Sequence, residues 1–120
     1  MTRSRRTDLR RAERAGKSSK ARLDALVEEA TIDAYGDTEQ ISGLFTMIEE
    51  HLRVPFEANV LGIKVVVERA DLNDADEIVV VCRVGKRRQR IPILDLPLPT
   101  PTPEGAEWIA AYRHWLGART

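Results

Sequence analysis

The sequence predicts an α+β domain with two N-terminal helices, a small four-stranded antiparallel sheet or barrel, and one C-terminal helix. Three observations indicate this order. Apolar residues recur at helical spacing between residues 23 and 52, short β-branched runs fill residues 56–94, and helical spacing returns after residue 103. With 120 residues, 42% of them hydrophobic, the chain has room for one such domain.

The first predicted helix begins at residue 21 and ends before Gly36, because glycine is common just past a helix C-terminus. Residues at i, i+3, i+4 and i+7 form its buried face: Leu23, Leu26, Val27 and Ala30. The second helix is predicted to begin at Asp37, with Gln40 reaching back in a capping box, and to end before Pro55. Its apolar stripe consists of Ile41, Leu44, Phe45, Ile48 and Leu52.

Four strands are predicted at residues 56–61, 63–68, 78–84 and 88–94. Tight turns at Gly62 and at Gly85-Lys86 favour an antiparallel meander or a small barrel over parallel βαβ units. Prolines at 97, 99, 101 and 103 predict an extended connector. We expect Thr102 to cap the last helix, which ends at Gly117 and presents Trp108, Ile109, Tyr112, Trp115 and Leu116.

The charges are strongly segregated, although the formal net charge is zero. Residues 1–22 contain nine Lys and Arg against two acidic residues, whereas residues 24–57 contain nine acidic residues against Arg53 alone. We expect residues 1–19 to be a disordered basic tail that favours an anionic partner, and residues 20–120 to form the domain. The acidic region of that domain favours cations.

Several classes of protein are disfavoured by what the sequence lacks. No run of 18 apolar residues indicates a transmembrane helix, and residues 1–20 do not resemble a secretory signal, so we expect a cytoplasmic protein. Cys82, the only cysteine, permits no internal disulfide and no cysteine-based zinc site, and reads as a buried strand residue. The sequence has no glycine-rich phosphate loop and no evident triad, so we do not expect an enzyme.

The acidic second helix is a candidate site for a hard cation. At 100° per residue, Glu39 and Glu50 lie roughly opposite the apolar stripe and Glu49 flanks it. The turn at residues 34–37 could add backbone carbonyls, which calcium uses together with carboxylates. A solvated helix face with a capping Asp37 explains the same pattern. The segment 71–77 begins like an EF-hand loop but has Cys82 at the final glutamate position, so it is a polar turn or an auxiliary cation contact.

A basic hairpin offers the alternative function. Lys86, Arg87, Arg88 and Arg90, together with the basic tail, could contact the phosphates of a nucleic acid or a ribosome. No aromatic residues interleave with these cations, and charged strand edges also discourage aggregation. His51 and His114 stand alone and indicate no zinc site or catalytic pair.

Residues 20–117 resemble the CcbP-type calcium-binding proteins, which are small bacterial proteins. The resemblance is carried by AYGDTEQ, by PFEA at the entry to the first strand, and by the C-terminal AYRHWLG. It implies a compact α+β domain that binds Ca²⁺ through surface carboxylates without an EF-hand. The ligands carried over are Asp37, Glu39, Glu49 and Glu50, followed by Asp33 and Glu57. The leading hypothesis is therefore a calcium buffer or low-affinity sensor that uses the acidic 33–57 region.

Overall fold

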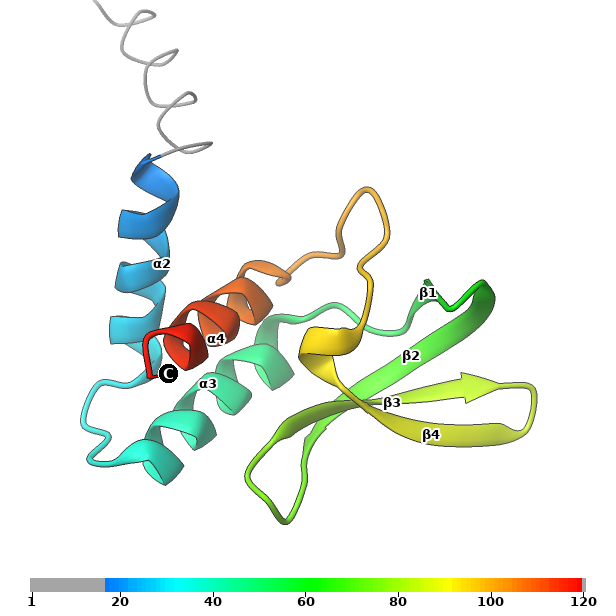
Figure 1. The fold of residues 1–120 in the computed structure, drawn as a ribbon, viewed down its shortest axis with the longest axis horizontal. Coiled ribbons are helices and arrows are strands. Elements are labelled where there is room, and N and C mark those ends of the chain that lie inside the picture. Colours follow the sequence, from blue (N-terminus) through cyan, green and yellow to red (C-terminus); the bar gives the residue numbers. More distant parts are fainter. Residues whose placement is uncertain (1–16, 120) are drawn as a thin grey trace, which may run out of the picture.

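The computed structural model describes residues 17–119, and it confirms the α+β fold class (Figure 1). The predicted disorder of residues 1–16 lies outside the described residues. The elements follow one another in the order α2 (Lys17–Ala30), α3 (Asp37–His51), β1 (Phe56–Val60), β2 (Ile63–Leu72), β3 (Ile78–Val84), β4 (Arg87–Pro92), the short 3-10 helix η1 (Ile93–Asp95) and α4 (Glu107–Gly117).

The four strands form one antiparallel meander in which each strand pairs with its sequence neighbours, in the order β1-β2-β3-β4. Because β1 and β4 lie at opposite edges, the sheet is open, which resolves the predicted choice between sheet and barrel. The β1–β2 turn consists of Leu61 and Gly62, with φ values of 52° and 81°. A register shift between Val67 and Arg69 interrupts the pairing of β2 with β3.

The helices form a layer on one side of this sheet. In Figure 1, α3 and α4 run side by side between α2 and the sheet, and α2 contacts both of them. Gly43 allows the close approach of α2, because a Cβ at that position would overlap the carbonyl oxygen of Ala30. None of the helices within residues 17–119 is long and apolar enough to cross a membrane.

The core lies between the helical layer and the inner face of the sheet. Its largest fully buried side chains come from α3, the two central strands and η1: Leu44, Ile48, Val67, Ile78, Val80 and Ile93. Helix α4 contributes the buried faces of both tryptophans, Trp108 and Trp115. The predicted apolar stripes of α3 and α4 therefore point inward, as expected for amphipathic helices on a sheet, except for Leu116, which is exposed.

Two helix starts differ from the prediction. Helix α2 begins at Lys17, four residues before the predicted start, so three residues of the predicted tail belong to a helix. Helix α4 begins at Glu107, not near Pro103. The chain turns at Gly105 instead, with φ 90°, where it packs so closely on the His51 carbonyl that a Cβ would overlap it. A glycine at this position supports the turn, which delays the helix.

Candidate metal centre

The predicted acidic residues divide between the two ends of α3. Asp37 and Glu39 lie in its first turn, and Glu49 and Glu50 lie in its last turn, ten to thirteen residues later. At a rise of 1.5 Å per residue this separation is about 15–20 Å. Calcium–oxygen distances are about 2.3–2.6 Å, so one ion cannot be bound by both pairs. All four side chains are exposed.

The first turn of α3 is organised differently from the predicted capping box. The N-cap residue is Gly36, with φ 110°, which has no side chain to bond the free N–H groups of the helix. Glu39 instead reaches back, and its Oε1 accepts a hydrogen bond of 2.6 Å from the Tyr35 N–H. The prediction that Asp37 caps the helix is therefore wrong, because the freedom of glycine places the cap one residue earlier.

Asp37 and Gln40 face the C-terminal end of α4. The Oδ1 of Asp37 lies 3.1 Å from Nη2 of Arg119. The amide oxygen of Gln40 accepts hydrogen bonds from the Trp115 Nε1 (2.8 Å) and from the Arg119 Nη2 (2.7 Å). The guanidinium of Arg119 also lies 4.1 Å from the centre of the Trp115 ring. Arg119 thus supplies a positive charge directly beside Asp37.

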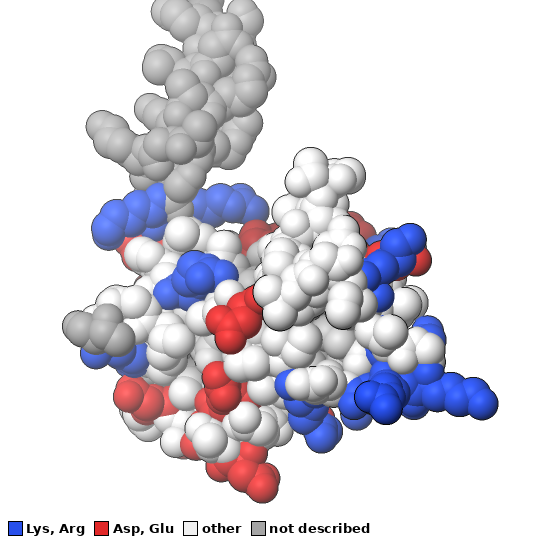
Figure 2. Space-filling model, turned by 45° about the vertical axis from the view of Figure 1, so that its right-hand side comes forward, with Lys and Arg blue, Asp and Glu red and all other residues white. Residues whose placement is uncertain are grey.

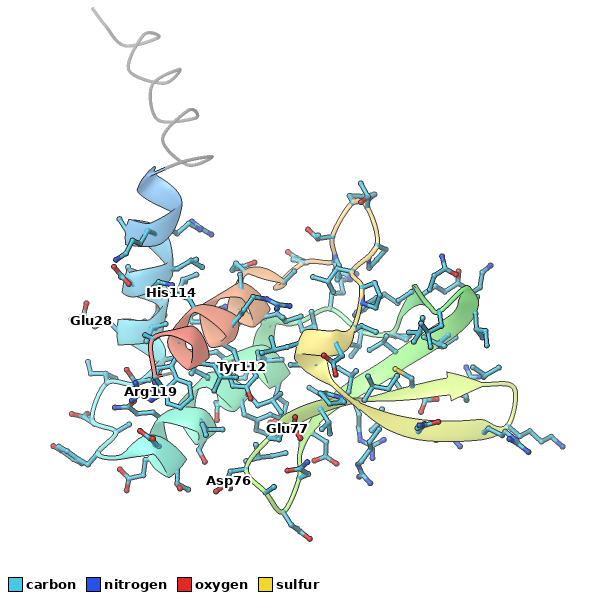
Figure 3. All side chains as sticks on the ribbon, in the orientation of Figure 1. Glu28, Asp76, Glu77, Tyr112, His114 and Arg119 are labelled. Atoms are coloured by element: carbon cyan, nitrogen blue, oxygen red, sulfur yellow. The ribbon has the colours of Figure 1, made fainter. Side chains whose placement is uncertain are left out.

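The β2–β3 loop lies beside the first turn of α3. The hydroxyl of Thr38 donates to Oδ2 of Asp76, at 3.5 Å, across 38 positions of sequence. Figure 3 shows Asp76 and Glu77 on this loop, below α3 and α4. Within the loop, the Oδ1 of Asn73 accepts hydrogen bonds from the N–H groups of Ala75 and Glu77, both at 2.9 Å. These bonds form an Asx turn, as predicted for a polar turn, and they leave the carboxylates exposed.

Two acidic segments therefore meet near the N-terminus of α3: the first turn of the helix and the β2–β3 loop. The loop 31–36, which contains Asp33, leads into the same turn. Sequence reasoning assigned the β2–β3 loop a mainly structural role, because no local pattern reports its contact with Thr38. Figure 2 shows Asp and Glu gathered at the bottom of the molecule, and Lys and Arg gathered at its lower right.

The other predicted ligands lie apart from this region. Glu57 is on β1, where its Oε1 lies 3.7 Å from the Nζ of Lys64. Glu49 borders a small hollow of about 70 Å³ that Arg69 also lines, so a cation there would meet a positive neighbour. Within residues 17–119, no three His, Cys, Asp or Glu side chains are close enough to hold a metal ion without rearrangement.

The basic hairpin is partly neutralised by ion pairs on the outer face of the sheet. Glu68 accepts hydrogen bonds of 2.8 Å from Arg88 and Arg83, which hold the pKa of its carboxyl below the usual range. Arg90 bonds to Asp71 at 2.7 Å and lowers the pKa of that carboxyl in the same way. Two of the four predicted phosphate-binding cations are thus paired within the sheet.

Comparison with known proteins identifies the class to which this domain belongs. A family model described as calcium binding matches residues 24–116, most of the chain. The protein is therefore a calcium-binding protein, and Ca²⁺ is its ligand. It belongs to the CcbP-type calcium-binding family, as the sequence motifs indicated. Comparisons with curated proteins and with solved structures gave no match.

Proposed function

We propose that the protein binds calcium at the N-terminal end of α3. It acts in the cytoplasm as a calcium buffer or low-affinity sensor and does not catalyse a reaction. The contact between Thr38 and Asp76 carries this proposal. It joins the β2–β3 loop to the first turn of α3, so acidic residues that are distant in the sequence lie on neighbouring segments. The candidate ligands there are Asp33, Asp37, Glu39, Asp74, Asp76 and Glu77.

The chemistry of these donors suits calcium. Calcium takes six to eight hard oxygen ligands in irregular geometry, from carboxylates and from backbone carbonyls. The segments that meet at α3 contain three residues with left-handed backbone, Asp33 (φ 64°), Gly36 (φ 110°) and Asp76 (φ 60°). Backbone of this kind turns sharply and leaves carbonyl groups outside regular hydrogen-bonded structure. Magnesium, which demands compact octahedral geometry, is less well served by such loops.

The same arrangement supports a modest affinity. The carboxylates must approach one another against their mutual repulsion before they can share an ion. Asp37 must also give up or share the Arg119 guanidinium, and Glu39 must release the Tyr35 N–H. The N-terminus of a helix carries about half a positive charge, which opposes a cation further. A site with these costs releases its ion readily, as a buffer or a low-affinity sensor requires.

The test is calorimetric titration of the full chain with calcium in chelator-treated buffer. Replacing Asp37→Asn and Glu39→Gln together should weaken binding at least tenfold, about 1.4 kcal/mol. The matched control replaces Glu49→Gln and Glu50→Gln, which removes the same charge from the far end of α3 and should change binding less than threefold. Circular dichroism checks that the helix persists in both variants.

The opposite ranking of the two double variants would place the ion at the C-terminal end of α3. Asp76→Asn tests the β2–β3 loop separately and should weaken binding while leaving α3 intact. If Asp76→Asn binds calcium as the wild type does, the loop is not part of the site. A titration with magnesium should give a much weaker response than calcium.

A further inference from the structure

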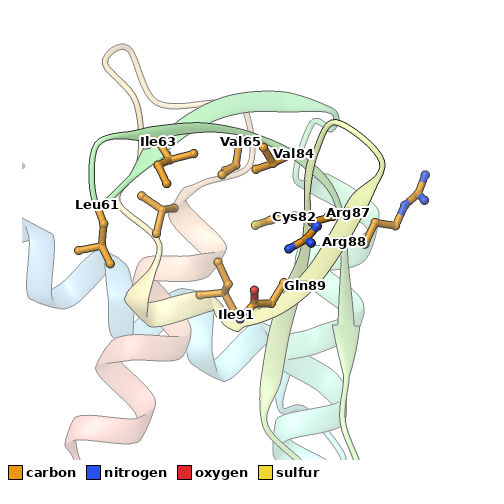
Figure 4. Close-up of a pocket in the computed structure, with 10 residues that line it drawn as sticks. Leu61, Ile63, Val65, Cys82, Val84, Arg87, Arg88, Gln89 and Ile91 are labelled. Atoms are coloured by element: carbon orange, nitrogen blue, oxygen red, sulfur yellow. The ribbon is translucent and has the colours of Figure 1, made fainter.

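The sheet carries an apolar groove at the end that the helices leave uncovered. In Figure 1 the β1–β2 and β3–β4 hairpins extend away from α3 and α4. The groove has a volume of about 720 Å³ and lies on the concave side of these hairpins (Figure 4). Val65 and Cys82, two core residues on the central strands, line it, so the groove continues the core surface outward. The exposed apolar side chains Leu61, Ile63 and Val84 border it.

Leu61 is unfavourable for folding in two independent ways. Its side chain is 96% exposed, so it contributes almost no burial to the folded chain. Its φ of 52° lies in the left-handed region, which is sterically unfavourable for a residue with a branched side chain. The Leu61-Gly62 turn, with both φ values positive, normally has Asn, Asp or Gly at its first position. A leucine that is both exposed and in a left-handed turn points to a contact outside the domain.

The groove is bordered by positive charge. Arg87 lines it, and Lys86 lies at the tip of the same hairpin. Neither side chain forms an ion pair within the part of the chain that the structure describes, whereas Arg88 is paired with Glu68. Free cations beside an apolar surface complement a partner that combines apolar and acidic side chains. Residues 1–16 of this chain are strongly basic and do not meet that requirement.

We propose that this groove binds an amphipathic helix of a partner protein, with an apolar face flanked by Asp and Glu. A helix fits better than an added strand, because side chains from all four strands line the groove across the face of the sheet, whereas an added strand would pair with the backbone of one edge. Its volume is in the range of pockets that enclose several apolar groups. A second copy of this chain offers no such helix face, since its other exposed apolar residues within residues 17–119 are scattered: Ile32, Tyr35 and Leu116.

The experiment is a selection from a displayed library of helical peptides, with leucines fixed on one face and Glu or Lys varied at the flanking positions. The full chain is used as bait, once with calcium and once with chelator, because this proposal does not rest on the calcium site. We expect enrichment of Glu-flanked peptides. Leu61→Asn should weaken their binding at least tenfold, and Arg87→Glu should shift the enrichment toward Lys-flanked peptides. The control Ile32→Asn removes an exposed apolar side chain elsewhere and should not alter binding.

The melting temperature distinguishes a binding role from a folding role. Asn suits the left-handed turn, so Leu61→Asn should melt at the same temperature as the wild type or higher. A lower melting temperature would mean that Leu61 serves the fold and would overturn the proposal. The proposal would also be overturned if no peptide were enriched or if Lys-flanked peptides were enriched. It would be overturned as well if Leu61→Asn did not weaken the binding of Glu-flanked peptides. Sedimentation of the wild type as a dimer that Leu61→Asn dissociates would overturn it too, because a second copy would then occupy the groove.

Discussion

Replacing Arg119 with glutamine should raise the affinity for calcium while lowering the stability of the fold. The guanidinium of Arg119 lies 3.1 Å from Asp37, which is a proposed calcium ligand. It also bonds to Gln40 and stacks on Trp115. Calcium and Arg119 therefore compete for one carboxylate. Removing Arg119 therefore raises the affinity of Asp37 for calcium. Losing the contacts of Arg119 with Gln40 and Trp115 weakens the packing of α4 against α3.

The size of each effect follows from the exposure of the groups. The carboxylate of Asp37 is 71% exposed, and an exposed ion pair is worth about 0.2–1 kcal/mol. If calcium binding breaks this pair, its removal strengthens binding by up to about fivefold, since 1.4 kcal/mol corresponds to a factor of ten. The cation–π contact with Trp115 contributes about 0.5–1 kcal/mol to stability, which the variant loses.

Calorimetric titration measures the affinity, and thermal unfolding without calcium measures the stability. Arg113→Gln is the matched control, because it removes the same charge from the adjacent helix α4, where Arg113 bonds to the Leu94 carbonyl instead. An unchanged or weaker affinity in Arg119→Gln would refute the competition. An equal gain in Arg113→Gln would show that net charge, not contact with Asp37, is responsible.

Three further predictions concern the fold and its ligand. Gly43→Ala should destabilise the protein by about 1–3 kcal/mol, because the new Cβ overlaps the carbonyl oxygen of Ala30, as urea unfolding can measure. Glu68→Gln should lower the free energy of unfolding at neutral pH, because Glu68 then loses the charge that Arg88 and Arg83 stabilise. Saturating calcium should raise the melting temperature, since a ligand at a hundred times its Kd stabilises the folded state by about 2.7 kcal/mol.

Each of these predictions has its own control. Ser42→Ala, beside Gly43 on α3, should change stability little, and a comparable loss there would remove the steric explanation. The pKa of Glu68 is lowered in the folded state, so its contribution is present above about pH 4.3 and disappears as pH falls through that lowered value. The difference between wild type and Glu68→Gln should vanish in the same range. Magnesium at equal concentration should raise the melting temperature less than calcium does.

The sequence was sufficient to predict the three helices and four strands in their order, because each has its own apolar period. The 3-10 helix η1 was missed, since residues 93 and 94 were assigned to the last strand. The sequence was also insufficient at the ends of helices, where single backbone positions decide the outcome. Gly36, with a positive φ, is the N-cap of α3, where a capping Asp37 side chain was expected. Gly105, also with a positive φ, forms a turn where a helix starting at Pro103 was expected. The contacts around the candidate site also could not be predicted from the sequence. Thr38 meets Asp76, and Arg119 meets the start of α3, only after the whole chain has folded.

The position of α4 in the chain has a consequence for synthesis on the ribosome. This helix supplies five buried residues and contacts α2, α3 and η1, yet it is made after every other described element. The strands pair only with sequence neighbours, so the meander can form once β4 has left the exit tunnel. The apolar faces of α2 and α3, by contrast, lack their main partner until α4 emerges. A nascent chain stalled before residue 107 would therefore hold a paired sheet beside two helices whose apolar faces are only partly covered, a species prone to aggregate.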